Sequence, residues 1–267
     1  MYEKIIDFHT HAFPDDLAER ALNKLTYKSK VKPSFNGTVR GLLQSMDEAG
    51  IEKAVLLNIA TKPTQVENII IWCKKIRSER IIPFPSIHPE NENYREILKK
   101  IKGEGFKGIK LHPMFQNFDM INEKMFFIYE EIAKNKLILV FHSGYDIAFP
   151  EDERASVKKL KKVHQKFPEL KIVASHTGGW NMWKEVLNEI AGLNIWIEIS
   201  MTVKYIDDIE IFYKILEKHD NDKILFGTDA PWSSQKEEVE KFKNLKIEDS
   251  FKNKILYENA FTLLNNG

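Results

Sequence analysis

The chain has 267 residues, a length that suits either two small domains or one α/β barrel, which typically takes about 250 residues. Its apolar share of 43% and its charged share of 30% are ordinary for a globular protein and exclude a disordered or fibrous chain. The 40 basic and 39 acidic residues leave a net charge of +1, so we expect neither a nucleic-acid partner nor attraction to an anionic membrane.

Cysteine use and hydropathy indicate where the protein works. Cys73 is the only cysteine, so no internal disulfide can form, as is usual in a reducing compartment. No uninterrupted apolar segment approaches the ~18 residues of a membrane-spanning helix, and Glu3, Lys4 and Asp7 place charges where a secretion signal is apolar. We therefore expect a cytoplasmic protein whose partner is a small-molecule substrate. The sequence leaves a homodimer open.

Eight short apolar segments, rich in β-branched residues, predict strands. In chain order they are Lys4–Phe8, Lys53–Ile59, Ile81–Ile87, Lys107–Leu111, Leu137–Phe141, Lys171–Ser175, Asn194–Ser200 and Lys223–Phe226. The segments between them place apolar residues at helical spacing, as at Val66, Ile70 and Cys73. Strands that are apolar on both faces and alternate with helices are typical of a parallel sheet covered by helices. The pattern predicts an α/β fold, a (β/α)8 TIM barrel that spans residues 1–267 as a single domain.

Two segments depart from this alternation. The first connection is longer than the others, and its polar middle, Tyr27–Gly37, predicts a loop or lid inserted after strand 1. The last segment, Lys236–Gly267, has helical spacing of its apolar residues and is expected to close the barrel.

Polar side chains stand where the apolar strands end. The carboxyl ends of parallel barrel strands meet at one rim, where active sites are built, so residues far apart in the chain converge there. The residues at these ends are His9 and His11 on strand 1, Lys110 and His112 on strand 4, His142 on strand 5, His176 on strand 6 and Asp229 on strand 8.

The residue types at this rim indicate a metal site. Side chains two positions apart on a strand point the same way, so His9 and His11 can bind one ion together. With His142 and Asp229 they complete a set of nitrogen and oxygen ligands that leaves one position for water. We expect zinc or another divalent transition metal such as manganese.

Lys110 is unusual because a lysine inside an apolar strand is costly unless it is paired or chemically altered. Three interpretations stay open: an ion pair with a carboxylate such as Asp229 or Glu198, binding of an acidic substrate, or carbamylation that bridges two metals. The lysine is therefore a candidate catalytic residue.

Three further side chains are candidates for substrate binding. His112 faces the same way as Lys110 and is expected to reach the substrate. Trp180 and Trp232 each follow closely after a site residue and can form a pocket wall, although packing of a loop onto the barrel explains them equally well.

Five sequence motifs resemble those of a known group of proteins. They are Ile6–His11 (IDFHTH), Gly108–Pro113 (GIKLHP), Val140–Gly144 (VFHSG), Ala174–Gly179 (ASHTGG) and Leu225–Pro231 (LFGTDAP). In this order they resemble the amidohydrolase superfamily of metal-dependent TIM-barrel hydrolases. The nearest branch is the amidohydrolase-2 group, which includes aminocarboxymuconate-semialdehyde decarboxylase and related decarboxylases. The resemblance extends to Glu258–Leu264 near the end of the chain.

The resemblance implies roles for the rim residues. His9, His11 and His142 would be metal ligands, and Asp229 would be both a ligand and a proton acceptor. His176 would be either a ligand of a second metal or a catalytic histidine. Lys110 is similar to a strand-4 lysine that related enzymes carbamylate, whereas the amidohydrolase-2 group generally binds one metal. One ion is favoured, and two remain open.

Taken together, the sequence predicts a metal-dependent hydrolase of a small amide, ester or lactone. The metal would activate a water molecule, Asp229 would accept its proton, and His176 would stabilise the developing oxyanion or hold the substrate. The alternative is non-oxidative decarboxylation of a small carboxylic acid at the same site. A binding module without activity is disfavoured because the expected ligands are all present.

Overall fold

A computed structural model describes residues 4–265, so the ends of the predicted domain, including Gly267, lie outside the described residues. Within that range the chain contains eight strands, each starting within two residues of a predicted one. Their bounds are β1 Ile6–Thr10, β2 Lys53–Leu57, β3 Ile81–Phe84, β4 Gly108–Leu111, β5 Ile138–Phe141, β6 Ile172–Ala174, β7 Trp196–Glu198 and β8 Ile224–Leu225.

Neighbouring strands pair in parallel and follow the order of the chain. Strands β1 to β3 form one sheet and β4 to β8 another. Ala54 pairs with Ile81 in the first sheet, and Lys110 pairs with Val140 in the second. Backbone hydrogen bonds join the two sheets. The N–H of Lys110 donates to the carbonyl of Pro85 at 3.0 Å, and that of Phe8 donates to the carbonyl of Phe226 at 2.8 Å. The strands therefore close into the predicted TIM barrel.

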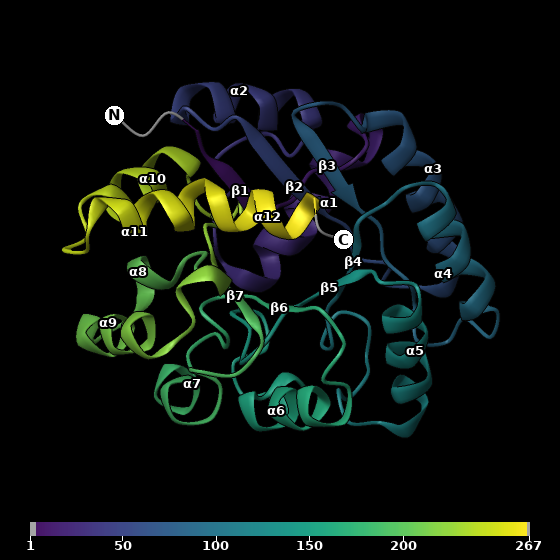
Figure 1. Ribbon diagram of the computed structural model, residues 1–267. Helices are drawn as coiled ribbons and strands as arrows, with labels where there is room; N and C mark the ends of the chain where they lie inside the picture. The colour runs from purple at the N-terminus through teal and green to yellow at the C-terminus, as the bar shows by residue number, and fades with distance from the viewer. Residues whose placement is uncertain (1–3, 266–267) are drawn as a thin grey trace.

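Helices surround the strands (Figure 1). Their bounds are α1 Asp15–Ser29, α2 Val39–Ala49, α3 Val66–Ile76, α4 Tyr94–Gly103, α5 Glu123–Lys134, α6 Val157–Lys166, α7 Trp183–Glu189, α8 Thr202–Tyr205, α9 Ile209–Lys218, α10 Gln235–Lys243, α11 Asp249–Asn253 and α12 Asn259–Asn265. A π-helical segment, Lys254–Glu258, joins α11 to α12. Among residues 4–265, none of the helices is both long and apolar enough to cross a membrane.

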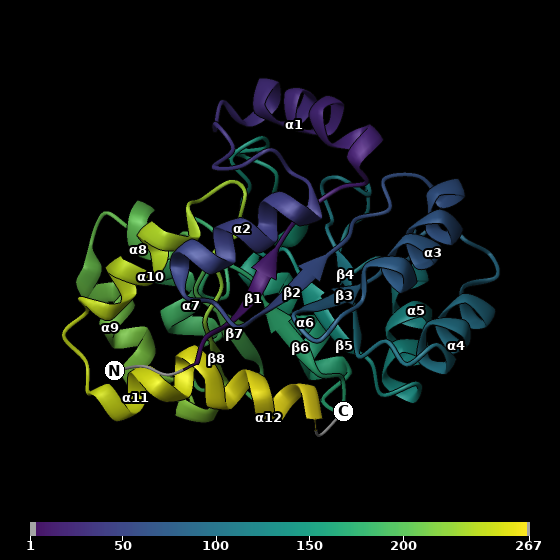
Figure 2. The same ribbon diagram turned by 90° about the horizontal axis from the view of Figure 1, so that it is seen from above.

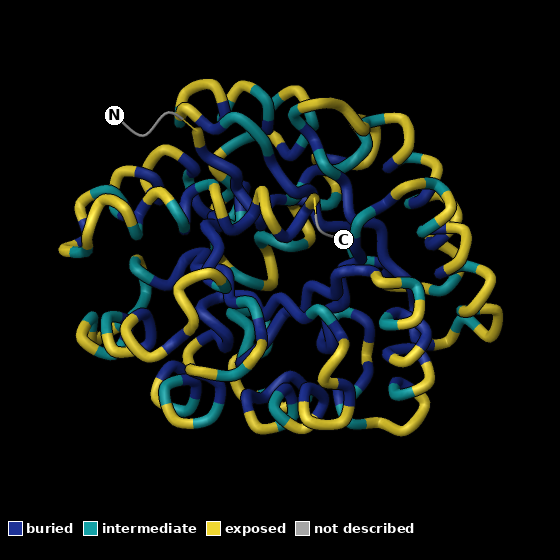
Figure 3. The backbone as a smooth tube through the Cα atoms, in the orientation of Figure 1, coloured by how far each residue is buried: buried dark blue, intermediate teal, exposed yellow. Residues whose placement is uncertain are grey.

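The core has two layers, one inside the barrel and one between strands and helices. Alternate side chains of the strands, such as Phe8, Val140 and Val173, pack inside the barrel. Their neighbours on the strands, such as Leu139, pack outward against the helices. Figure 3 shows the result, a buried centre and exposure along the outer faces of the helices. Inside the barrel the apolar layer continues into α12, which closes the amino-terminal end of the strands (Figure 2).

The insertion after strand 1 differs from the predicted loop. Tyr27 belongs to helix α1, and only residues 30–38 form the loop that leads to α2. The helix forms because Asp15 and Asp16 lie in its first turn and its apolar residues, Ala18, Leu22 and Leu25, recur at helical spacing. Figure 2 shows α1 at the end of the barrel opposite α12, above the carboxyl ends of the strands.

Candidate active site

Three potential metal ligands converge where β1 and β8 end. Nε2 of His9 lies 3.1 Å from Nε2 of His11, and Oδ1 of Asp229 lies 3.3 Å from the first and 3.1 Å from the second. Asp229 follows β8 in a left-handed backbone conformation (φ 62°), which aspartate tolerates better than most residues. The strand places the two histidines on one side, and this turn brings the carboxylate to them.

Hydrogen bonds at Nδ1 of each histidine determine whether its Nε2 is free to bind a metal. Nδ1 of His11 lies 2.8 Å from the carbonyl of Leu57, which can only accept, so Nδ1 carries the proton. Nδ1 of His9 lies 2.7 Å from Oε1 of Glu198 and donates to this carboxylate. In the neutral rings both Nε2 atoms are therefore bare acceptors that face each other and a third acceptor, Asp229. A cation fits between them, and its ligand set would be two nitrogens and one oxygen.

The electrostatics of this cluster suit a cation. Burial, together with the charge of Lys110, lowers the pKa of His9 to about 4, so its ring is neutral. Burial opposes ionisation of Glu198, yet His9 and neighbouring hydrogen bonds lower the pKa of this carboxyl to about 2. The pKa of Asp229 is also lowered, against its burial, by His9 and His11. Neutral imidazoles and ionised carboxylates are the states that bind metals.

Glu198 and Ser200 contact the site histidines, and the sequence did not indicate these contacts. Glu198 lies at the end of β7 and accepts from Nδ1 of His9, from the N–H of His176 at 3.0 Å and from the N–H of Ser200 at 2.8 Å. A Cβ atom at Gly227 would lie 2.3 Å from Oε2 of Glu198, so a larger residue at this position would displace the carboxylate. The alternation of Glu198 and Ser200 at a strand end was the available signal.

His142 and His176 form a second pair beside the first cluster. Nδ1 of His142 lies 3.2 Å from Nε2 of His176, and Nε2 of His142 lies 2.8 Å from the carbonyl of Tyr145. The ring of His142 stacks on His112 with centroids 4.1 Å apart, and Nε2 of His112 lies 3.3 Å from Oδ2 of Asp146. His142, a predicted ligand, therefore groups with His112 and Asp146 rather than with His9, His11 and Asp229.

Lys110 is buried inside the barrel with 1% of its surface exposed. Its Nζ donates to Oγ of Ser175 at 3.0 Å, and its interactions with Glu198 and Asp229 are longer-range attractions. Burial lowers the pKa of the ammonium group to about 8 despite these carboxylates. Of the three interpretations of this lysine, a contact ion pair with Asp229 or Glu198 is not the one in the structure.

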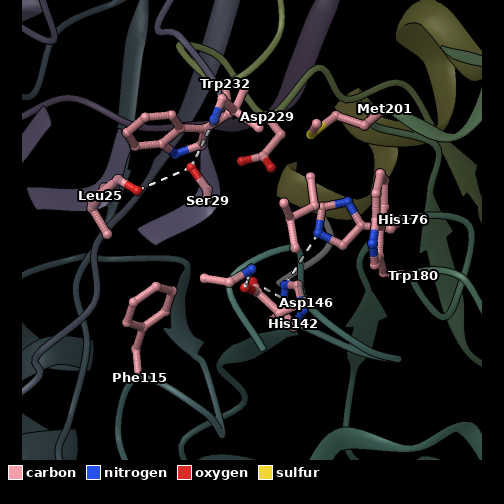
Figure 4. A pocket seen from close by; sticks show the side chains of 13 residues that line it. Leu25, Ser29, Phe115, His142, Asp146, His176, Trp180, Met201, Asp229 and Trp232 are labelled. Atoms are coloured by element: carbon pink, nitrogen blue, oxygen red, sulfur yellow. Dashed lines mark hydrogen bonds and ion pairs between the residues drawn. The ribbon is translucent and has the colours of Figure 1, made fainter. Parts of the chain in front are cut away.

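A cavity with mostly apolar walls opens above these polar groups (Figure 4). Its walls include the rings of Phe115, Trp180 and Trp232, and Leu25 of α1 contributes from above. The other lining residues include Met201, Ile147, His142, His176, Asp146 and Asp229. Trp180 packs edge-on against His176 with centroids 5.5 Å apart. The two predicted wall tryptophans thus line the cavity together with the polar groups of His142, His176, Asp146 and Asp229.

A TIM barrel with a His-x-His pair, an aspartate after strand 8 and a cavity at the same rim defines a metal-dependent barrel enzyme. The chain belongs to the amidohydrolase family, whose sequence model matches residues 6–265. No curated protein matches the sequence.

Solved structures share the fold over the whole chain. An uncharacterised TIM-barrel protein from Bordetella bronchiseptica is 20% identical, with a TM-score of 0.80 and 98% of each chain covered. A dihydroxybenzoic acid decarboxylase from Polaromonas, which has bound manganese and an inhibitor, is 17% identical, with a TM-score of 0.73 and coverage of 98% of this chain and 97% of that one. The 5-carboxyvanillate decarboxylase of Sphingomonas paucimobilis is 13% identical, with a TM-score of 0.72 and coverage of 98% and 99%.

These comparisons overturn the expectation of a hydrolase for amides, esters or lactones. The structural neighbours are mostly metal-dependent decarboxylases of aromatic acids, so the alternative expectation, decarboxylation, fits better. The sequence did not separate the two reactions because both use the same ligand residues. Of the three rings that line the cavity, Trp180 and Trp232 were expected as walls from the sequence, and Phe115 was not.

Proposed function

We propose that the protein is a metal-dependent, non-oxidative decarboxylase of an aromatic carboxylic acid. The observation that carries this proposal is the cavity, in which aromatic walls stand directly beside a cluster of metal-ligand atoms. An aromatic ring packs favourably against Phe115, Trp180 and Trp232 in edge-on or offset geometry. Its carboxylate then reaches polar side chains that line the cavity, among them His176 and Asp229.

One divalent transition metal, manganese or zinc, would be held by His9, His11 and Asp229. Bound there, it would polarise and anchor the oxygens of the substrate. Manganese is supported by the decarboxylase from Polaromonas, which binds this ion. One ion is favoured because the ligand atoms of His9, His11 and Asp229 meet at one place, whereas Nδ1 of His142 faces Nε2 of His176.

The reaction breaks the bond between the ring carbon and the carboxylate and forms a bond between that carbon and a proton. The electron pair of the broken bond remains on the ring, carbon dioxide leaves, and neither an oxidant nor a reductant is consumed. The protein must therefore supply one proton at the ring carbon. His176 is the proposed donor for this step because it lines the cavity, and Asp229, ionised at neutral pH, would balance the charge of the metal.

The test is a search for carbon dioxide release from purified protein loaded with manganese or with zinc. The substrates 2,6-dihydroxybenzoate and 5-carboxyvanillate are starting points because structural neighbours act on them. In D2O, the product should carry one deuterium at the carbon that lost its carboxylate. The matched control is His11→Ala, which should lose metal and activity together. Metal-loaded protein that decarboxylates none of a broad set of aromatic acids would contradict the proposal.

A further inference from the structure

A second carboxylate, that of Asp146, lines the cavity in addition to Asp229. Asp146 lies in the loop after β5, and 14% of its side-chain surface is exposed. Figure 4 shows Asp146 beside His142 and Asp229 beside Trp232, so the two carboxylates lie at different places in the cavity wall. The proposed reaction uses Asp229 and gives Asp146 no part. The carboxylate of Asp146 is therefore available to interact with the rest of the substrate.

The contacts of Asp146 hold its carboxylate in place and leave one oxygen able to accept more. Oδ1 accepts from the N–H of Ala148 at 2.7 Å, and this bond fixes the turn that presents the side chain. Oδ2 lies 3.3 Å from Nε2 of His112 and 3.6 Å from Nε2 of His142. A carboxylate offers about four lone-pair sites, so Oδ2 can also accept a hydrogen bond from a ligand in the cavity.

The cavity lacks a positive side chain that would neutralise a second acidic group. Among the described residues, those that line it include neither lysine nor arginine. Lys110 is buried and is not part of the lining. Lys28, on α1, is exposed, and its Nζ lies over the rings of Phe149 and Phe115, 5.1 and 5.8 Å from their centroids. A second carboxylate on the ring would thus meet the like charge of Asp146, and like charges repel more strongly between apolar walls than in water.

We propose that Asp146 determines which aromatic acids the cavity accepts: it binds a hydrogen-bond donor on the ring, a hydroxyl or an amino group, and rejects a second acidic group. The substrate is then an aromatic monocarboxylic acid that carries such a donor, and aromatic diacids are excluded. The inference deepens the proposed function and rests on it for the orientation of the ring, in which the reacting carboxylate lies near Asp229 and His176 and the donor reaches Asp146.

Ligand binding measures this selectivity without turnover. The probes are benzoate, the three monohydroxybenzoates and the three benzenedicarboxylates, so that a donor and a second acid are compared at each ring position. Each is titrated by calorimetry into zinc-loaded protein. At one ring position or more, we expect the hydroxyl group to strengthen binding about 10-fold relative to benzoate and the second carboxylate to weaken it about 10-fold.

Two variants assign the selectivity to Asp146. Asp146→Asn and Asp146→Ser both remove the charge, and both side chains can still accept from the N–H of residue 148. In each, the ratio of the two affinities at that ring position should fall about 10-fold or more, with unchanged zinc content. Asp152→Asn is the matched control, because Asp152 lies in the same loop but outside the cavity lining and pairs with Arg154 at 2.9 Å. Its affinities should equal those of the unmodified protein.

Three results would overturn the role of Asp146. The first is a dicarboxylate that binds as tightly as the matching hydroxybenzoate at every ring position, and the second is an unchanged ratio in both variants. The third is a second zinc ion that is lost in Asp146→Asn, because Asp146 would then be a metal ligand with His112 and His142. Selective binding without carbon dioxide release from any hydroxylated acid would refute the proposed function and leave the role of Asp146 standing, whereas binding of none of the probes would refute both.

Discussion

Oε1 of Glu198 lies 2.7 Å from Nδ1 of His9, although 189 positions separate the two residues in the chain. This contact fixes the tautomer of His9 and presents its Nε2 to His11 and Asp229. A carboxylate behind a ligating histidine also makes that histidine a stronger donor to a metal. Through this contact Glu198 would orient His9 toward a metal held by His9, His11 and Asp229.

Substitution of Glu198 by glutamine should weaken metal binding about 10- to 100-fold. Glu198 accepts four hydrogen bonds. In Glu198→Gln the amide NH2 group cannot accept, and it would have to face at least one of these four donors. Titration of the metal-free protein with manganese or zinc measures the effect. Glu131→Gln, on α5, is the control and should bind metal as the unmodified protein does. Unchanged affinity in Glu198→Gln would contradict the role assigned to this residue.

The barrel and its rim were predictable because they depend on local patterns. Apolar segments at regular intervals predict strands, and parallel topology alone brings His9, His11 and Asp229 to one end. Long-range contacts between side chains were not predictable. The bond between Glu198 and His9 depends on the packing of β7 beside the barrel interior, and no spacing along the chain indicates it.

The same limit explains the other differences between sequence and structure. His142 ends its strand like the other histidines, but the carbonyl of Tyr145 and the ring of His112 determine where its nitrogens point. Helix α1 was missed because its polar end at Tyr27 has the composition of a loop. The proposed substrate class rests on cavity walls such as Phe115 and Leu25, which come from separate segments of the chain.

Lys110 should make the folded protein more stable as the pH rises from 8 to 10. Burial lowers the pKa of its ammonium group from 10.5 to about 8, so between these values the unfolded chain binds more protons than the folded one. The free energy of unfolding then increases with pH, here by about 2 kcal/mol. Urea unfolding at both pH values should show this increase relative to Lys110→Met, and exposed Lys24→Met should behave like the unmodified protein.

A second measurement addresses the chemical state of Lys110. We expect a free amine that donates to Ser175, as in the structure. Electron density from metal-loaded crystals that shows a carboxylated Lys110 between two ions would refute this expectation and establish a two-metal site.

Trp232→Ala should raise KM for an aromatic acid about tenfold or more and change kcat less. The indole forms a wall of the cavity, and an aromatic contact contributes about 0.5–1.5 kcal/mol beyond the burial of its area. Steady-state kinetics with the identified substrate provide the measurement. Trp72→Ala, on α3 and outside the cavity, should leave KM unchanged. An equal rise in both variants would point to a general loss of stability instead of a lost substrate contact.

Asp229→Asn should preserve the fold while it impairs both metal binding and turnover. Asparagine tolerates the left-handed backbone at this position, and its amide oxygen can still coordinate weakly. It lacks the negative charge that balances a divalent cation and cannot carry a proton. We expect turnover to fall by about 10²–10⁴-fold at saturating metal, with little change in melting temperature. Turnover within threefold of the unmodified protein would exclude an essential role for this carboxylate.

His176→Asn should abolish most turnover and leave the metal in place. His176 also has a left-handed backbone, with φ 59°, so asparagine is the substitution that disturbs the chain least. The ligand atoms of His9, His11 and Asp229 meet without it, so metal content should equal that of the unmodified protein. Loss of the proton donor should lower kcat by about 10²–10⁴-fold.

Added imidazole separates this role from a structural one. If His176 supplies the proton to the ring carbon, imidazole in the buffer should restore part of the activity of His176→Asn, because the cavity is open at the position that the ring vacates. The same imidazole should not restore Asp229→Asn, whose defect is in charge and coordination. Loss of metal from His176→Asn would instead identify His176 as a ligand, the other role that the sequence left open, and another group would then have to protonate the ring carbon.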